Sequence, residues 1–344
     1  MTHTSAHPST RASAFAPAFA SVDRRAFSLG LLALAGATAL PARAQDPWPA
    51  AKPIRLVLPF SAGGPGDTNV RAMAQALGKR LNQSLIVDNR PGAGGIIGSE
   101  YVAKAAPDGY TWLSAGNGAI ANALLRPKMP YAETDLVAVV GTSTAPSVLV
   151  TNASVPARNL KDLQAWARTK GRLNFGTAGS GSTGHFVAEM VEAALGVPVT
   201  LVHYKSGSQT VNAIVGGEVD LASEAPIGVS AFVQSGRLHA LALTARERTG
   251  PMKQVPTTVE QGFPTILMQH WGGIFAPKGT PPAVLDRIAD VTVRAYKEDA
   301  DLIATTERGG AQPMLLARAE FEKYLVEERA RMAQIVTASH MTLE

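Results

Sequence analysis

Two segments of this sequence combine glycine with hydroxyl side chains in a way that suits the binding of an anion. They are residues 59–69 and 176–185, and together they contain seven glycines. Neither segment contains lysine or arginine, and only His185 could carry a positive charge. Each segment leads into an expected helix, whose first N–H groups lack partners inside the helix and favour a negative charge. The pattern predicts an anion held by backbone N–H groups and hydroxyls; the alternative is that the glycines only form turns.

Other kinds of reactive site find little support in the sequence. Cysteine does not occur, which excludes disulfides, zinc–thiolate sites and cysteine nucleophiles. Residues 179–184 read G-x-G-x-x-G, but a dinucleotide site also needs an acidic residue about 20 positions later, where the sequence has Val202-His203-Tyr204-Lys205. Neither a G-x-S-x-G nor a G-x-x-x-x-G-K-[ST] motif is present. We therefore expect no catalytic residue and no cofactor, and we predict that the protein is not an enzyme.

The histidines do not form a metal-binding pattern. His185, His203, His239 and His270 lack H-x-x-x-H and H-x-H spacing, so no metal site is expected. His185 is either a ligand contact or a surface residue in the first turn of a helix. His203 lies in an apolar run, which predicts a place in the core.

The order of elements around the two glycine-rich loops is repeated along the chain. A strand at 52–58, a helix at 70–81 and a strand at 85–88 are followed by a second glycine-rich loop, a short helix and a strand at 110–114. The same order begins again at Arg172. Strands that alternate with helices predict sheets covered on both faces, with ligands beyond the carboxyl ends of the strands. We therefore predict an α/β fold of two lobes, each with a parallel-rich sheet, and a ligand cleft between them.

The first 44 residues predict a targeting signal rather than a folded domain. Arg24-Arg25 precedes an apolar stretch that ends at Ala42-Arg43-Ala44, the pattern of a secretory signal peptide cleaved before Gln45. The arginine pair also resembles a twin-arginine signal, with the general secretory route as the alternative. We expect a soluble protein of the periplasm.

The net charge of +5 comes largely from this N-terminal segment. Residues 1–44 contain four arginines and one aspartate, so the remainder has 28 basic and 26 acidic residues and a net charge of +2. A nearly neutral protein gives no reason to expect a nucleic-acid partner.

Several segments, which follow in order over residues 52–282, resemble the extracytoplasmic solute receptors of tripartite tricarboxylate transporters, the Bug family. The matching segments are Pro59–Gly64 with Asp67 and Arg71, Asn89–Gly95, Pro107–Thr111, Gly176–Gly181, Tyr204–Gly207, Gly217–Leu221, Pro256-Thr257 with Glu260 and Gly262, and Trp271–Pro281. Three places depart from the common family pattern, namely Ser61, Ser206 and residues 223–225.

The resemblance implies a two-lobe periplasmic binding protein that closes on a small carboxylate. We expect the chain to cross between lobes near residues 146 and 269, so that 45–146 and 269–344 form one lobe and 147–268 the other. The ligand contacts that the resemblance implies are Phe60, Ala62 and Gly64 in the first lobe, Thr177, Ser182 and Thr183 in the second, and Ser114, Asn117, Tyr204 and Glu224 in the wall.

Two acidic residues leave alternatives open. Asp67 is either the N-cap of the first helix or a ligand contact. If Asp67 or Glu224 faces the ligand, a ligand that carries an amine is favoured, because two adjacent carboxylates repel each other.

The resemblance further implies a receptor, acting as a monomer, that delivers an organic acid to the membrane permease subunits of a tripartite tricarboxylate transporter. One alternative is an orphan receptor that presents its ligand to a sensor kinase. Another is an exported enzyme that uses the same cleft.

Overall fold

The computed structural model describes residues 48–63, 65–339 and 341. Residues 46–344 form one compact unit, and the description below concerns this unit. The predicted signal peptide, residues 1–44, and the predicted ligand contact Gly64 lie outside the described residues.

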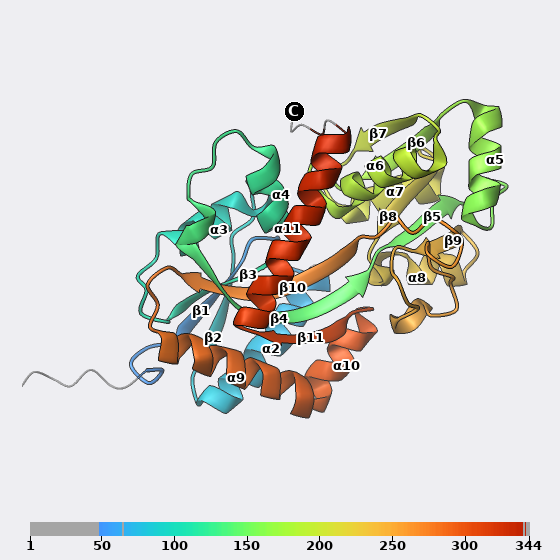
Figure 1. Ribbon diagram of the computed structural model, residues 1–344. Helices are drawn as coiled ribbons and strands as arrows, with labels where there is room; N and C mark the ends of the chain where they lie inside the picture. The colour runs from blue at the N-terminus through green and yellow to red at the C-terminus, as the bar shows by residue number, and fades with distance from the viewer. Residues whose placement is uncertain (1–47, 64, 340, 342–344) are drawn as a thin grey trace, which may run out of the picture. The chain divides into compact units, whose positions relative to one another are not determined.

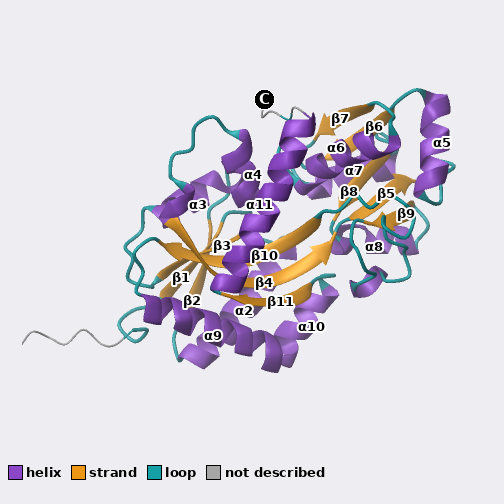
Figure 2. Cartoon of the chain, in the orientation of Figure 1, coloured by secondary structure: helices purple, strands orange, loops and turns teal. Residues whose placement is uncertain are grey.

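One mixed sheet organises the part of the unit that we call lobe I (Figures 1 and 2). Its strands are β1 (Ile54–Leu58), β2 (Leu85–Asn89), β3 (Thr111–Gly116), β4 (Leu136–Pro146), β10 (Gln269–Pro277) and β11 (Gln312–Ala317). They are ordered β11-β4-β10-β3-β1-β2. Strand β1 pairs in parallel with β2 and β3, whereas β10 is antiparallel to both β3 and β4.

Helices cover both faces of this sheet, which explains the continuous apolar run in β1. On one face lie α2 (Pro65–Leu81), α9 (Pro282–Glu298) and α10 (Ala300–Arg308), and on the other α3 (Ile96–Ala103), α4 (Asn117–Leu125) and α11 (Ala319–Ser339). The helix predicted at 70–81 lies within α2 and buries one apolar stripe, which consists of Val70, Met73, Leu77 and Leu81. Helix α9 has Pro282 at its first position, as expected from the fixed φ angle of proline.

A second mixed sheet organises lobe II. Its strands are β5 (Val148–Asn152), β6 (Leu173–Thr177), β7 (Val199–His203), β8 (Leu221–Glu224) and β9 (Leu238–Leu243), in the order β7-β6-β8-β5-β9. Its helices are α5 (Leu160–Lys170), α6 (Thr183–Leu195), α7 (Gly207–Gly216) and α8 (Pro226–Gln234). Helices α5, α6 and α7 each begin at a capping side chain and end at a left-handed glycine, namely Gly171, Gly196 and Gly217.

The repeat predicted from the sequence is present in both sheets. The order β2-β1-β3 in lobe I corresponds to β7-β6-β8 in lobe II, and both sets of three strands are parallel. Beyond these strands the pairing is antiparallel in both sheets. The two-lobe α/β architecture is therefore confirmed, and each sheet is mixed because the chain returns between lobes through added antiparallel strands.

The chain crosses between the lobes at Ser147 and again between β9 and β10. Thr244 joins the two crossovers, because its N–H donates to the Ser147 carbonyl at 2.9 Å and its carbonyl accepts from the Met268 N–H at 3.1 Å. We call Ser147, Thr244 and Met268 the hinge.

Helix α11 runs along both lobes on one side of the hinge (Figure 1). Phe321, near its start, is fully buried against Gly141 and Gly273 of the lobe I sheet. A Cβ atom at Gly273 would lie 2.3 Å from Cζ of Phe321, so only glycine fits there. Further along, Met332 belongs to the same apolar cluster as Phe186 of α6.

Candidate functional site

The carboxyl ends of the parallel strands bring the predicted loops to the edges of the sheets that face the hinge. In lobe II, Glu224 at the end of β8 pairs with Val148, which follows Ser147 directly. In lobe I, Gly116 at the end of β3 pairs with Gly272 at the beginning of β10. Each glycine-rich loop therefore begins on the edge from which the chain crosses to the other lobe, where ligands of open α/β sheets bind.

Asp67 fixes the glycine-rich loop of residues 59–64, which we call the lobe I loop. Its carboxylate accepts from the Gly63 N–H at 3.0 Å, from Nε of Arg71 at 2.9 Å and from Nδ2 of Asn89 at 2.9 Å. The same amide of Asn89 also donates to the Phe60 carbonyl at 3.1 Å. The hydrogen bond from Arg71 lowers the pKa of Asp67 to about 2, and the bonds from Gly63 and Asn89 act in the same direction.

Of the two alternatives for Asp67, the N-cap of its helix is excluded, because α2 begins at Pro65 and Asp67 lies inside its first turn. Its side chain is buried and its oxygens already accept three protein donors. The i,i+4 spacing of Asp67 and Arg71 was the signal in the sequence for this pair. Asn89 could be found only from the pairing of β2 with β1.

The outer part of the lobe I loop is open to solvent. Phe60 is 52% exposed, and Ala62 is exposed as well. Asn89 holds the Phe60 carbonyl and Asp67 holds the Gly63 N–H, so the backbone on either side of Ala62 is fixed while both predicted contacts stay accessible to solvent.

Side chains fix the glycine-rich loop of residues 178–182, which we call the lobe II loop, at two points. The Gly179 N–H donates to Oγ1 of Thr177 at 3.2 Å, and this hydroxyl lies 2.6 Å from Nδ1 of His203. The Gly181 N–H donates to Nδ1 of His185 at 3.0 Å. Both glycines have positive φ angles, 109° at Gly179 and 76° at Gly181, so the turn requires residues without a Cβ atom.

The three hydroxyl residues predicted as lobe II contacts differ in what their side chains do. Thr177 is fully buried and supports the loop, and Ser182 is the N-cap of α6, accepting from the His185 N–H. Thr183 is half-buried, and its hydroxyl has no hydrogen-bond partner among the described residues. Of the three, Thr183 has the hydroxyl that remains for a ligand.

The structure excludes one of the two alternatives for His185 and corrects the prediction for His203. His185 is 3% exposed, so it is not a surface residue, and its Nδ1 binds the loop backbone. His203 is exposed rather than in the core, because β7 is the edge strand of its sheet. The rings meet edge to face with centroids 5.0 Å apart. This pair could not be found from the sequence, because the two residues come from different elements.

The predicted wall residues of lobe I lie at the end of β3. Ser114 is buried on this strand. Asn117, the first residue of α4, donates to the Gln269 carbonyl at 2.9 Å and accepts from the Trp271 N–H at 3.1 Å. Asn117 therefore ties this loop edge to the beginning of β10, where the chain enters lobe I from the hinge.

The two wall residues predicted in lobe II, Tyr204 and Glu224, contact different parts of the protein. The Tyr204 hydroxyl donates to Glu218 at 3.1 Å. Glu224 instead places its carboxyl group against the start of helix α7: a Cβ atom at Gly207 would lie 2.8 Å from Oε2 of Glu224. Burial raises the pKa of Glu224 to about 7, and its hydrogen bond with Thr210 offsets only part of this effect.

A further polar group, which the sequence analysis did not identify, lies at the hinge. The hydroxyls of Ser147 and Ser223 are 2.6 Å apart, and Nε2 of His270 lies 3.3 Å from the Ser147 hydroxyl. Burial lowers the pKa of His270 to about 4, so this ring is neutral at physiological pH. Serine and histidine at these positions carry no sequence signal, because their meeting depends on the crossover.

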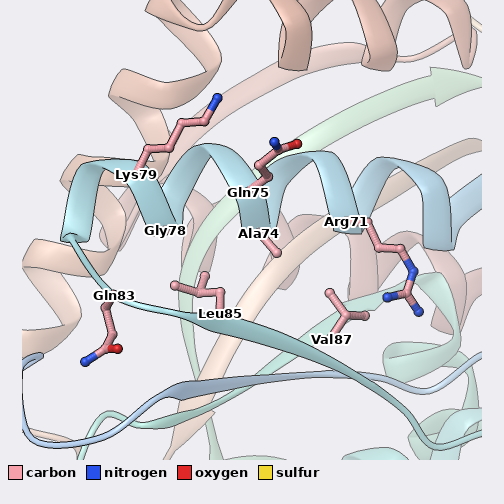
Figure 3. A pocket seen from close by; sticks show the side chains of 8 residues that line it. All are labelled: Arg71, Ala74, Gln75, Gly78, Lys79, Gln83, Leu85 and Val87. Carbon is pink, nitrogen blue, oxygen red and sulfur yellow. The ribbon is translucent and has the colours of Figure 1, made fainter.

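Two hollows lie away from the loops. One, with a volume of about 440 Å³, lies between α2 and β2, where Leu85 and Val87 point toward the helix (Figure 3). The other, of about 360 Å³, lies beside the hinge and includes Thr244 and Arg331.

Among the described residues, no group of three or more acidic, histidine or cysteine side chains could hold a metal ion. Within the same part of the chain, no helix is long and apolar enough to span a bilayer.

This chain has two sheets that are joined by two crossovers, and each sheet has loops at the edge that faces the hinge. This is the architecture of the two-lobe periplasmic binding proteins. The chain resembles the R. palustris protein Rpa4515 solved with adipate, with a TM-score of 0.79 and 29% identity, covering 86% of this chain and 100% of that one. It also resembles MatC from Rhodopseudomonas palustris with bound malate, with a TM-score of 0.74 and 27% identity, covering 83% of this chain and 99% of that one.

The chain belongs to the tripartite tricarboxylate transporter family receptors, whose sequence profile matches residues 69–341. Protein BugT of Bordetella pertussis is 32% identical over 312 residues, which cover 90% of this chain and 95% of BugT. The predicted membership of the Bug family is therefore confirmed. The family is one of solute receptors, not enzymes.

Proposed function

We propose that this chain is a periplasmic receptor that captures a small organic carboxylate and delivers it to the permease subunits of a tripartite tricarboxylate transporter. The observation that carries the proposal is the pair of loops, 59–64 and 178–182, at the hinge-facing edges of the two sheets. Each loop is fixed by its own protein contacts, and neither contains lysine or arginine.

Such loops can bind a carboxylate without an ion pair. The His185 N–H is bound by Ser182, but the N–H groups of Thr183 and Gly184, the first two residues of α6, have no acceptor inside the helix, and the Thr183 hydroxyl is available beside them. Hydrogen bonds to a charged group contribute about 1.5–3 kcal/mol each, so three or four support micromolar affinity, which requires about 8 kcal/mol. The adipate and malate bound to the two structural relatives are both carboxylates, in agreement with this class of ligand.

We propose residues 45–146 and 269–344 as lobe I, 147–268 as lobe II, and a single chain as the working receptor. The proposed ligand contacts are Phe60, Ala62, Gly64, Ser114, Asn117 and Thr183. Thr177 and Ser182 shape the loop that carries Thr183, and Asp67 has the same role in lobe I.

A thermal-shift screen tests the proposal. The purified protein is heated with adipate, malate, citrate, aspartate, glutamate or nicotinate at millimolar concentration. A ligand at 100 times its Kd adds about 2.7 kcal/mol to stability, which raises Tm by several degrees in a protein of this size. Amides of the same acids serve as controls and should leave Tm unchanged. A shift with the amides but not with the acids, or recovery of a chemically altered ligand from the denatured complex, would contradict a carboxylate receptor.

A further inference from the structure

One side chain of the lobe II loop can act only in a defined protonation state. The Gly181 N–H donates to Nδ1 of His185 at 3.0 Å, so this ring nitrogen must present a lone pair. On the other side of the ring, Nε2 lies 3.4 Å from Oε1 of Glu189, one turn later on α6. The proton of the ring therefore resides on Nε2, and the ring is neutral whenever the bond to Gly181 is formed.

His203 does not impose the same condition on the loop. Its Nδ1 faces the hydroxyl of Thr177, which can both donate and accept. A proton on His203 would reverse that hydrogen bond, while the Thr177 oxygen could still accept the Gly179 N–H. The backbone N–H of Gly181 has no such freedom, because it is always a donor. Protonation of His185 is thus the event that removes a bond from the loop.

Among the residues that the structure describes, two titratable groups contact the imidazole of His185. The titratable groups that face the ring are Glu189 on its own helix and His203 on β7. From β8 the backbone carbonyl of Ser223 lies close to Gly184, the residue before His185, and α11 joins α6 in an apolar cluster through Met332. Within the part of the chain that the structure describes, Glu189 is the acidic group within ion-pair distance of this imidazole.

We infer that His185 is a positioning residue, which sets the shape of loop 178–182 only as a neutral imidazole, so that acid releases the loop. A proton on Nδ1 would place two N–H donors face to face at the present distance, and the contact with Gly181 would be lost. Two imidazolium rings at 5.0 Å would also repel each other. The consequence for carboxylate capture rests on the proposed function, whereas the effect on the loop does not.

Three substitutions of His185 separate the effect of its hydrogen-bond acceptor from the effect of its charge. His185→Asn keeps an acceptor, Oδ1, close to the position of Nδ1, and it does not titrate. His185→Gln carries the same amide one carbon further out and misplaces that acceptor, and His185→Phe keeps a ring without any acceptor. His239→Asn is the matched control, because Nδ1 of His239 also faces a fixed donor, Arg158 at 2.7 Å, but lies on the edge strand β9.

The first readout needs no ligand: amide exchange of Gly181, expressed as a protection factor, together with the ¹⁵N shifts of the His185 ring. We expect the wild type and His239→Asn to lose several-fold more protection than His185→Asn between pH 7.5 and 5.5. His185→Asn should lose less than about twofold, and the Gln and Phe variants should be unprotected already at pH 7.5. A proton on Nδ1 at pH 7.5, full protection in His185→Phe, or a wild-type pH response in His185→Asn would each overturn the inference.

The second readout is the affinity for adipate over the same pH range. In the wild type, we expect the affinity for adipate to decrease with pH in parallel with the protection of the Gly181 amide. In His185→Asn, the affinity should lose most of its pH dependence. If the loop responds as expected while neither adipate nor the other acids bind, the role of His185 stands and the proposed function fails. If adipate binds equally well to His185→Phe and to the wild type, loop positioning by His185 is refuted while the receptor function stands.

Discussion

The carboxylate of Asp67 and the side-chain amide of Asn89 lie 2.9 Å apart, which joins the first turn of helix α2 to the end of strand β2. Through its second bond, to the Phe60 carbonyl, Asn89 also holds the outer part of the loop. The lobe I loop is therefore fixed by protein groups alone. A ligand that binds here meets a preformed surface, which reduces the entropy lost on binding.

Asp67→Asn should destabilise the protein and loosen this loop. The pKa of Asp67 is lowered, so its contribution to stability is present above its ordinary pKa near 4 and disappears as the pH falls toward 2. Because Arg71 is half exposed, we expect a loss of about 1–2 kcal/mol at pH 7 and a much smaller one at pH 2.5, measured by urea unfolding. Asp286→Asn, which breaks an exposed pair with Arg318, is the control and should cost less than about 0.5 kcal/mol. Equal losses at both pH values would argue against the charge of Asp67.

Thr183→Val keeps the shape of the side chain but removes a hydroxyl that makes no hydrogen bond to any other described residue. We expect it to weaken carboxylate binding by about 1–3 kcal/mol, measured by calorimetry with whichever acid the screen identifies. Lys205→Met is the companion variant, since Lys205 is an exposed cation near the loop. It should cost less than Thr183→Val, and affinity should depend only mildly on salt. A loss of several hundredfold in Lys205→Met beside a silent Thr183→Val would place the anion elsewhere.

Glu224→Gln should change how stability depends on pH. Burial raises the pKa of Glu224 from 4.5 to about 7, so the native state binds more protons than the unfolded chain between these values. Stability of the wild type therefore falls as the pH rises through this window, and the penalty is complete above pH 7. We expect Glu224→Gln to be more stable than the wild type at pH 8, by up to about 3 kcal/mol, and nearly equal at pH 4.5. Thermal unfolding at the two pH values measures this, with exposed Glu247→Gln as a control that should show no such difference.

Gly273→Ala should strain the contact between the lobe I sheet and helix α11. The added methyl group would lie 2.3 Å from Phe321, which is fully buried and cannot move aside. Overpacking of this kind costs about 1–3 kcal/mol. Phe321→Leu in the same chain should restore part of the loss, and a double-mutant cycle from urea unfolding measures the coupling. Additive effects of the two substitutions would show that they do not meet.

The repeated order of strands, loops and helices could be predicted from the amino-acid sequence, and so could the residue types of the two glycine-rich loops. Both follow from local chemistry: apolar periodicity sets the elements, Pro282 begins its helix, and positive φ angles require Gly179 and Gly181. The absence of lysine and arginine from the loops was likewise visible in the sequence, and it limits how an anion can be held.

Which side chains remain available for a ligand depends on the three-dimensional fold. Asp67, Thr177 and Ser182 have the residue types of ligand contacts, but their polar atoms are used by the protein itself. His185 reaches the loop from α6, and His203 is exposed because β7 lies at a sheet edge. These outcomes depend on strand order and register between distant segments, whereas a single sequence carries signals mainly about neighbours along the chain.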